Sequence, residues 1–207
     1  QRMDSSSDNI EISKVVSLIL QDKLEDVPRR SYLYSDLDYI LLGYLVEYVS
    51  ATTLMRYWYE KIGDPLKISD HFYMMGENGR KLKSAPFAVT GRCLWANSVL
   101  AGLVHDDNCR ALGRISGHAG LFGTLKGVVE LCETILLNYK GRKDNPSYNR
   151  KDLLYLLKQR KREQWACGFD VPTGEKSSCG QFFSKRTIGH LGFSGTSFWI
   201  DLMKGKI

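Results

Sequence analysis

The order of the hydrophobic patterns along this chain predicts an α+β fold. Apolar residues recur at the spacing of a helix face in residues 36–50 and again in 125–139, whereas short runs rich in β-branched and aromatic residues follow residue 164. Helices that precede a block of strands, rather than alternating with them, are typical of α+β proteins with an antiparallel sheet. With 207 residues, 43% of them hydrophobic, the chain can bury a core in one or two domains.

The first third of the chain is expected to form helices over residues 12–24, 36–50 and 51–62. The first helix ends toward Pro28, and Gly63-Asp64-Pro65 would stop the third. The second has the clearest pattern. Its expected apolar face consists of Leu37, Ile40, Leu41, Tyr44, Leu45 and Tyr48, and Ser35 or Asp36 is its natural N-cap.

The rest of the chain divides into an irregular stretch, two helices and a group of strands. Residues 64–115 carry many turn formers and are expected to hold little regular structure. Helices are expected over 125–139, capped by Thr124, and over 151–162. The expected strands are 166–171, 187–193 and 196–202, followed by a turn at Lys204-Gly205-Lys206. We therefore divide the chain into a mostly helical region, 1–163, and a strand region, 164–207.

The charge of +6 does not indicate a nucleic-acid partner. The basic residues are scattered apart from Lys158-Gln159-Arg160-Lys161-Arg162, and cations at a helix C-terminus favour the macrodipole. No zinc-finger spacing or glycine-aromatic ribonucleoprotein pattern is present, so no nucleic-acid binding is expected. No apolar run is long enough for a membrane span, and residues 1–8 show no signal-peptide pattern. These features leave the bacterial cytoplasm and the periplasm open, together with the oligomeric state.

The cysteines and histidines do not form a recognisable metal or disulfide pattern. Five cysteines lie far apart without a C-x-x-C pair, which favours free structural thiols; one disulfide, such as Cys167 with Cys179, is the alternative. His105, Asp106 and His118 could be imagined as metal ligands, but their pattern is too sparse for a site with three or four ligands. We expect neither a metal nor a cofactor.

Two motifs carry the functional signal. Tyr34-Ser35-Asp36 stands at the head of the clearest helix; from these three residues alone, an N-cap after a core aromatic residue explains it. The second motif, His190-Leu191-Gly192, lies in the segment from Ile188 to Asp201, which combines a strand, a glycine-containing turn and a second strand. By itself, a histidine on a strand is usually a hydrogen-bonded structural residue.

Together these motifs resemble the β-lactamase-related serine hydrolases, the esterase-like branch of the serine β-lactamase and penicillin-binding-protein superfamily. The eleven residues Leu33–Gly43 resemble that branch, as does the segment around His190-Leu191-Gly192. The resemblance extends over residues 15–203. It implies a β-lactamase/transpeptidase-like α+β fold that is present only in part, because the sequence contains no Ser-x-x-Lys.

The resemblance also implies roles for individual residues. Tyr34 would help to deprotonate a serine nucleophile, and Asp36 stands where Asn is commonest. His190 and the backbone N–H of Phe193 would stabilise an oxyanion, beside Gly192, which lets substrate lie against the strand. Leu191 replaces the usual hydroxyl residue of this motif and so removes a polar contact to substrate.

The sequence leaves two interpretations of His118 open, and it gives Ser194 no catalytic role. Gly117-His118-Ala119-Gly120-Leu121-Phe122-Gly123 resembles another stretch of the same branch, so His118 is either part of a pocket wall or a hydrogen-bonded residue in a glycine-rich lead-in to a helix. Ser194 lacks the G-x-S-x-G context of a nucleophile elbow and is interpreted as a turn residue.

The resemblance implies hydrolysis of a small-molecule ester or amide through an acyl-serine in the complete form of the protein. This chain is expected to be inactive because the nucleophile is missing from its sequence. The alternative is a non-catalytic relative that binds ligands in the same cleft.

Overall fold

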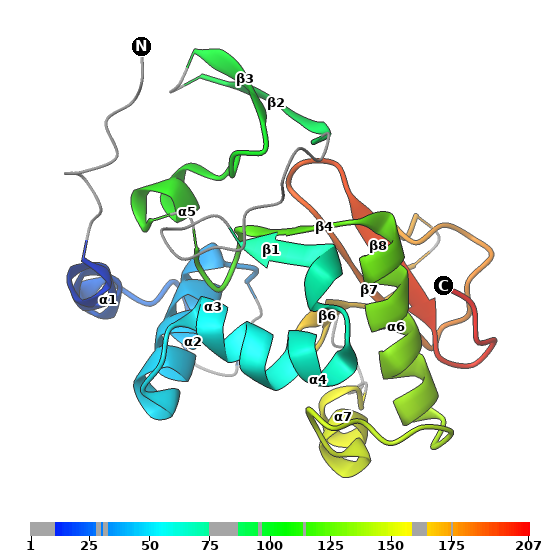
Figure 1. The fold of residues 1–207 in the computed structure, drawn as a ribbon. Helices are drawn as coiled ribbons and strands as arrows, with labels where there is room; N and C mark the ends of the chain where they lie inside the picture. Colours follow the sequence, from blue (N-terminus) through cyan, green and yellow to red (C-terminus); the bar gives the residue numbers. More distant parts are fainter. Residues whose placement is uncertain are drawn as a thin grey trace. The chain divides into compact units, whose positions relative to one another are not determined.

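The computed structural model describes residues 11–27, 30, 33–74, 87–94, 97–113, 115–158, 165–174 and 176–207 (Figure 1). The chain forms two units. The first contains Gln1–Tyr59 and Tyr73–Phe122, and the second contains Glu60–Phe72 and Gly123–Ile207. The chain passes from one unit to the other in η1 (Tyr59–Gly63, a π-helical turn), in β1 (Phe72–Met74) and in β4 (Leu121–Gly123). Strands β1 and β4 pair as a two-stranded sheet.

Helix α2 dominates the first unit. The elements of this unit are α1 (Ile12–Gln21), α2 (Asp36–Ser50), α3 (Leu54–Trp58), β2 (Val89–Cys93), β3 (Ser98–Ala101) and α5 (Asp107–Ala111). The Ser35 hydroxyl accepts the Leu37 N–H at the start of α2, and Ala51 ends the helix in the left-handed region at φ 52°. The predicted range of this helix, 36–50, is therefore confirmed.

The predicted apolar face of α2 is not its buried face. Only Ile40 and Gly43 are buried, whereas Leu45 and Tyr48 are exposed. Gly43 is buried because α2 passes close to the loop at Gly117; a methyl group on Gly43 would lie 2.9 Å from the Gly117 nitrogen. The close contact between Gly43 and the loop at Gly117, rather than the helical spacing of the apolar residues, therefore determines which residues of α2 are buried.

The continuous helix predicted over 51–62 is wrong. Ala51 and Thr52 lie outside any helix, and a new helix begins at Leu54 because the Thr53 hydroxyl accepts the Arg56 N–H. This helix, α3, ends at Trp58 and continues as η1. The Glu47 carboxylate also accepts the Leu54 N–H, at 2.7 Å, and so joins α2 to the start of α3.

Residues 64–115 hold more regular structure than expected. Strands β2 and β3 form an antiparallel hairpin, and Asp106 caps α5 by accepting the Cys109 N–H at 2.7 Å. Tyr73, Phe87 and Phe122 pack as an aromatic cluster, with ring centroids 5.2–5.8 Å apart. Residues 75–86 lie outside the described residues.

The second unit is a four-stranded antiparallel sheet with helices packed on it (Figure 1). Its elements are α4 (Asp64–Leu66), the 3₁₀ turn η2 (Ser69–His71), α6 (Leu125–Tyr139), α7 (Arg150–Leu156), β5 (Trp165–Ala166), β6 (Phe169–Asp170), β7 (Thr187–Leu191) and β8 (Ser197–Asp201). The strands follow the order β5-β6-β7-β8. The core includes Leu136 of α6, Leu153 of α7, Ile188 of β7 and Ile200 of β8. This arrangement confirms the predicted α+β class.

Most elements of the second unit follow the predictions. Helix α6 has the predicted bounds, and the Thr124 hydroxyl caps it by accepting the Gly127 N–H. The single strand predicted over 166–171 is wrong: β5 and β6 form a hairpin, with Gly168 at φ 81° in the turn. The turn predicted at Lys204-Gly205-Lys206 is confirmed, with Gly205 donating to the Asp201 carbonyl.

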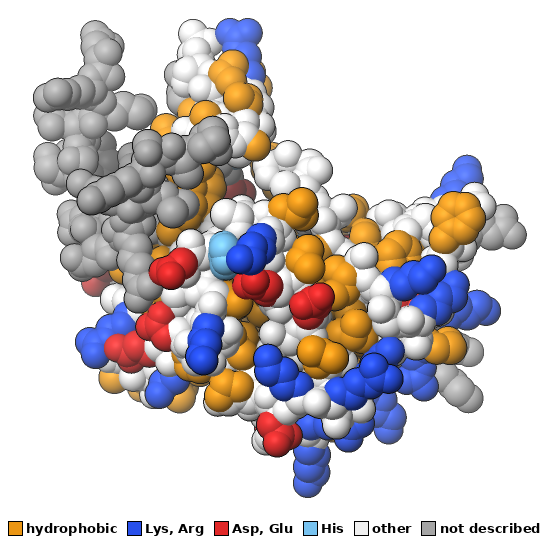
Figure 2. All heavy atoms as spheres, turned by 45° about the vertical axis from the view of Figure 1, so that its right-hand side comes forward, with side chains coloured by type: hydrophobic (Ala, Val, Ile, Leu, Met, Phe, Trp, Pro, Cys, Tyr) orange, Lys and Arg blue, Asp and Glu red, His pale blue; other side chains and the backbone are white. Residues whose placement is uncertain are grey.

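Basic side chains gather at the end of α6. Lys140 follows the helix directly, and its ammonium reaches Gly205 in the final turn, which carries Lys204 and Lys206. Figure 2 shows Lys and Arg side chains crowded over the lower part of one face of the molecule. The helix expected over 151–162 ends earlier than predicted: α7 ends at Leu156, Leu157 is its C-cap and Lys158 is not helical, and residues 159–164 lie outside the described residues. No helix in the described ranges is long and apolar enough to cross a bilayer.

Candidate active site

Tyr34 lies at the head of α2, two residues before the helix begins. Its side chain is about half exposed, at 51%. Ser35 is the N-cap, and Asp36 and Asp38 occupy the first turn, where the helix dipole favours negative charge. The same features that start the helix therefore hold Tyr34 at its end.

His190 lies where β7 emerges from the core. Residues Thr187, Ile188 and Gly189 are buried, His190 is half-buried and Leu191 is exposed. The His190 Nδ1 lies 2.7 Å from the Leu191 carbonyl oxygen. Because a carbonyl only accepts, Nδ1 is the donor in this contact.

The turn after β7 is tightly closed. The Gly192 N–H donates to the Thr196 carbonyl at 2.7 Å, and the Gly195 N–H donates to the Gly192 carbonyl at 2.9 Å. A methyl group at Gly192 would collide with the Thr196 side chain, so the turn itself already requires glycine there. Phe193 projects from this turn with its side chain 80% exposed. Ser194 is a turn residue, as predicted.

His118 is the centre of a hydrogen-bonded network in the first unit. Its Nε2 lies 2.8 Å from the Asp106 carboxylate and its Nδ1 lies 2.9 Å from the Ser116 hydroxyl, while the side chain is only 2% exposed. Since Asp106 also caps α5, the network ties the loop before β4 to α5. These hydrogen bonds agree with the interpretation of His118 as a hydrogen-bonded residue in the glycine-rich segment that leads into a helix. The neighbouring Ser116 and Gly117 line a cavity, so a pocket role stays a proposal.

The predicted site residues are divided between the two units. Tyr34, Asp36 and His118 belong to the first unit; His190, Leu191, Gly192 and Phe193 belong to the second. Within the first unit, Gly117, the neighbour of His118, packs on α2 beside Tyr39 and Gly43, and α2 begins two residues after Tyr34.

The five cysteines are free thiols in this structure. Cys93, Cys109, Cys132 and Cys179 are buried and Cys167 is exposed. Burial, with a smaller contribution from Asp106, raises the pKa of Cys109 to about 12, and burial raises the pKa of Cys132 to about 11. Neither thiol is therefore a ready nucleophile at neutral pH. Among the described residues, no three His, Cys, Asp or Glu side chains group closely enough to hold a metal.

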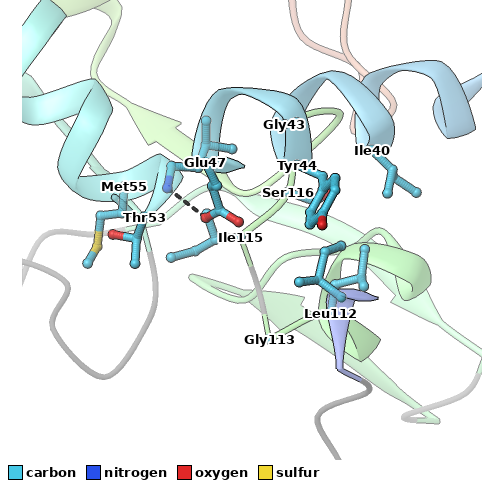
Figure 3. A pocket seen from close by; sticks show the side chains of 13 residues that line it. Ile40, Gly43, Tyr44, Glu47, Thr53, Met55, Leu112, Gly113, Ile115 and Ser116 are labelled. Atoms are coloured by element: carbon cyan, nitrogen blue, oxygen red, sulfur yellow. Dashed lines mark hydrogen bonds between the residues drawn. The ribbon is translucent and has the colours of Figure 1, made fainter. Parts of the chain in front are cut away.

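A cavity beside α2 was not anticipated from the sequence. Its volume is about 350 Å³, and it is lined by both apolar and polar groups from α1, α2, α3 and the loop after α5 (Figure 3). The Glu47 carboxylate lies among them, beside Ile115 and Tyr44. One signal was visible in the sequence: Glu47 is the single charged residue between Asp38 and Ser50 in an otherwise apolar helix.

The comparison with protein families identifies the family of this chain. The family model described as Beta-lactamase matches residues 2–206. The chain belongs to the beta-lactamase family. Its mixed α+β architecture is that of β-lactamases and penicillin-binding proteins, as the resemblance implied.

Curated relatives of this beta-lactamase-family chain are about twice its length. It is 30% identical over 203 residues to a protein of Escherichia coli (strain K12) named "Putative D-alanyl-D-alanine carboxypeptidase", and 27% identical over 207 residues to one of the same name from Salmonella typhi. Each alignment covers 91% of this chain and 46% of the relative. The chain thus spans about half the length of these relatives.

Solved structures show the same fold. EstCE1, a hydrolase with promiscuous acyltransferase activity, matches with a TM-score of 0.59 and 16% identity, covering 94% of this chain and 54% of that one. The octameric penicillin-binding protein homologue from Pyrococcus abyssi matches with a TM-score of 0.59 and 15% identity, covering 91% of this chain and 40% of that one. At these identities the likeness concerns the fold alone.

Proposed function

We propose that this chain is part of a serine hydrolase that cleaves a small ester or amide through an acyl-serine intermediate. The match of residues 2–206 to the beta-lactamase family carries this proposal. It is supported by the positions of the two motifs: Tyr34 lies half exposed at a helix head, and His190 lies where a strand leaves the core. The carboxypeptidase name of the relatives and the esterase-like structural neighbour agree with acyl transfer as the reaction class.

Tyr34 would assist proton transfer at the serine. A serine hydroxyl attacks a carbonyl slowly until a base takes its proton, and a tyrosine does this near neutral pH when a neighbouring ammonium stabilises the phenolate. Asp36, half-buried in the first turn, would accept a hydrogen bond from the substrate.

The His190 end of β7 would stabilise the negative charge of the tetrahedral intermediate. The His190 imidazole and the Phe193 N–H would supply the hydrogen-bond donors at the end of β7 and in the turn. Gly192 and Leu191 would line the acyl group, and the loop at His118 would form the wall of the pocket. Leu191 is exposed and apolar, which favours an uncharged acyl group over a carboxylate-bearing one.

The 207-residue chain by itself is expected not to catalyse the reaction, because its sequence holds no Ser-x-x-Lys. We expect no serine to be labelled by a fluorophosphonate probe in intact-mass and peptide mass spectrometry, and no hydrolysis of p-nitrophenyl butyrate above the blank. Stoichiometric labelling of one serine would contradict this expectation. If the parent chain did hydrolyse the ester, the expected inactivity would be wrong. If Tyr34→Phe and His190→Ala each then reduced that hydrolysis at least ~100-fold, the size of a general acid–base contribution, the two assigned roles would still be supported.

The absence of Ser-x-x-Lys from the sequence also favours a second candidate, a non-catalytic binding relative. The two candidates differ in what happens when the rest of the protein is supplied. A hydrolase would then catalyse hydrolysis of the substrate, whereas a binding relative would bind a small amide or ester without hydrolysing it. Substrate hydrolysis by the longer protein, measured together with equilibrium binding, distinguishes them.

A further inference from the structure

The positive charge of the chain belongs to the second unit. The first unit carries 12 Lys and Arg and 12 Asp and Glu, whereas the second carries 17 Lys and Arg and 11 Asp and Glu. The whole net charge of +6 therefore belongs to the unit that contains α6 and the four-stranded sheet. A unit with an excess of one sign of charge attracts partners of the opposite sign.

Eight cations of the second unit lie on three segments that meet at the end of α6. The Lys140 ammonium, just past that helix, reaches Gly205 in the final turn. From the segment before β7, the Arg186 guanidinium donates to the Tyr139 hydroxyl at 3.3 Å. The three segments are residues 139–150, 182–186 and 203–206. We call the surface that they form the basic surface, and its cations are Lys140, Arg142, Lys143, Arg150, Lys185, Arg186, Lys204 and Lys206.

Hydrogen bonds hold these cations in place without neutralising them. The Arg150 guanidinium donates to the Tyr139 carbonyl at 3.1 Å, and the Lys204 ammonium donates to the Phe182 carbonyl at 2.7 Å. Carbonyl and hydroxyl groups carry no net charge. The positive charges of these side chains therefore keep their attraction for an anion.

Acidic side chains are scarce on the basic surface. Asp144 is the one acidic residue in the sequence of its three segments, and Asp201, just before the final turn, is fully buried. The surface thus carries eight positive charges beside one exposed carboxylate. Groups of about four to eight Lys and Arg residues at a membrane are typical of proteins that bind anionic lipid headgroups.

Exposed apolar residues adjoin these cations. Phe182 is 89% exposed and Met203 is 63% exposed. Met203 precedes Lys204, whose ammonium binds the Phe182 carbonyl, so both apolar residues lie next to the same cation. Where lipid headgroups meet acyl chains, cations contact phosphates while apolar side chains leave water. A nucleic acid would supply phosphates without an apolar layer for Met203, so the basic surface fits a bilayer better.

We propose that the basic surface docks on a bilayer that contains anionic phospholipids, with its cations at the headgroups and with Phe182 and Met203 at the boundary of the acyl chains. None of the residues assigned to hydrolysis belongs to the basic surface, so docking does not depend on the proposed function.

The register of the sheet shows how docking would orient the second unit. Strands β7 and β8 pair Thr187 with Asp201 at one end and Leu191 with Ser197 at the other. The segment before β7 and the final turn, both parts of the basic surface, adjoin the first of these ends. His190 would therefore lie at the end of the sheet away from the bilayer.

Flotation of the 207-residue chain with lipid vesicles tests the proposal. We expect the chain to bind vesicles of phosphatidylglycerol, to leave vesicles of phosphatidylcholine unbound, and to bind less as the salt concentration rises. The triple variant Arg142→Gln/Lys143→Gln/Lys206→Gln should weaken binding at least ~10-fold, because the basic surface loses three cations. The matched control, Lys14→Gln/Lys23→Gln/Lys126→Gln, removes the same charge from exposed positions outside the basic surface and should weaken binding less than ~3-fold.

A second variant distinguishes a bilayer from a nucleic acid as the partner. Phe182→Ser/Met203→Ser keeps every charge and should weaken vesicle binding at least ~5-fold, because the apolar side chains no longer enter the acyl boundary. Vesicle binding that this variant leaves unchanged, together with tighter binding of the parent chain to duplex DNA, would overturn the proposal in favour of a nucleic acid.

The circular dichroism spectrum and melting temperature of all three variants should equal those of the parent chain, since every substituted side chain is exposed. Three further results would overturn the proposal: no binding to phosphatidylglycerol vesicles, equal binding to phosphatidylcholine vesicles, or equal weakening by the triple variant and its control. Because flotation measures binding alone, vesicle binding without hydrolysis would leave docking established and count only against the proposed function.

Discussion

Asp201 shows how a single buried carboxylate can organise one end of the second unit. It is fully buried at the end of β8 and accepts hydrogen bonds from the Ser184 backbone and hydroxyl and from the Met203 and Lys204 N–H groups, at 2.7–3.0 Å. Burial raises the pKa of Asp201, but the hydrogen bonds from Lys204, Ser184 and Met203 outweigh it, and the pKa is lowered below its ordinary value. The ionised form is therefore the one that the fold stabilises.

Replacing Asp201 with Asn should lower the free energy of unfolding at pH 7 by about 2–3 kcal/mol, because hydrogen bonds to a charged acceptor are lost. A lowered folded-state pKa stabilises the fold above the unfolded-state pKa of about 3.9, and this contribution is lost as pH falls through the folded-state value. The difference between Asp201→Asn and the parent should thus be largest near neutral pH and shrink below about pH 4. Urea unfolding at several pH values measures it, with the exposed Asp144→Asn as control. A pH-independent difference would show that charge is not the cause.

At the scale of elements, the packing of α2 on the loop at Gly117 depends on two glycines. A methyl group at Gly43 would lie 2.9 Å from the Gly117 nitrogen and 3.1 Å from its Cα, so backbone would have to move. Helix propensity acts in the opposite direction, since Ala is favoured over Gly inside a helix by about 1 kcal/mol.

The steric effect should exceed the propensity effect at Gly43. We expect Gly43→Ala to destabilise the first unit by about 1–3 kcal/mol, as overpacking of a close backbone contact does. Val49→Ala, at an exposed position of the same helix, should change stability by less than about 0.5 kcal/mol. Thermal unfolding followed by circular dichroism measures both, and a stabilised Gly43→Ala variant would mean that the contact with Gly117 is looser than described.

At the scale of the whole molecule, the two units differ in how they are packed. The second unit has a continuous core that joins α6 and α7 to the sheet, whereas α2, the main helix of the first unit, is largely exposed. Opening of a segment is easiest where few apolar contacts hold it closed.

Hydrogen exchange should therefore distinguish the units. In the chain alone, we expect peptides from β7 and β8 to exchange at least ~10-fold more slowly than peptides from α2. Equal protection of α2 and β7 in the chain alone would contradict the packing difference between the two units.

The predictions from sequence were accurate where local signals decide the outcome. The bounds of α2 and α6 agree with the predicted ranges because hydroxyl caps and helical periodicity lie within a few residues of each other. The predictions failed where backbone geometry depends on more than the hydrophobic pattern. The positive φ of Gly168 breaks an apparently continuous strand into a hairpin, and the Thr53 cap restarts a helix that the pattern treats as unbroken.

For the candidate site, the sequence by itself determined the family motifs: Tyr34 before a helix, His190-Leu191-Gly192 on a strand, and no Ser-x-x-Lys. These are matters of residue identity and spacing, which need no partner. Only the tertiary structure decided that Asp106 and Ser116 hold His118, that Gly192 packs on Thr196, and that α2 buries Ile40 and Gly43 while exposing Leu45 and Tyr48. Burial and hydrogen bonding depend on residues brought together from distant parts of the chain, and a periodic pattern shows that a face is apolar without showing what covers it.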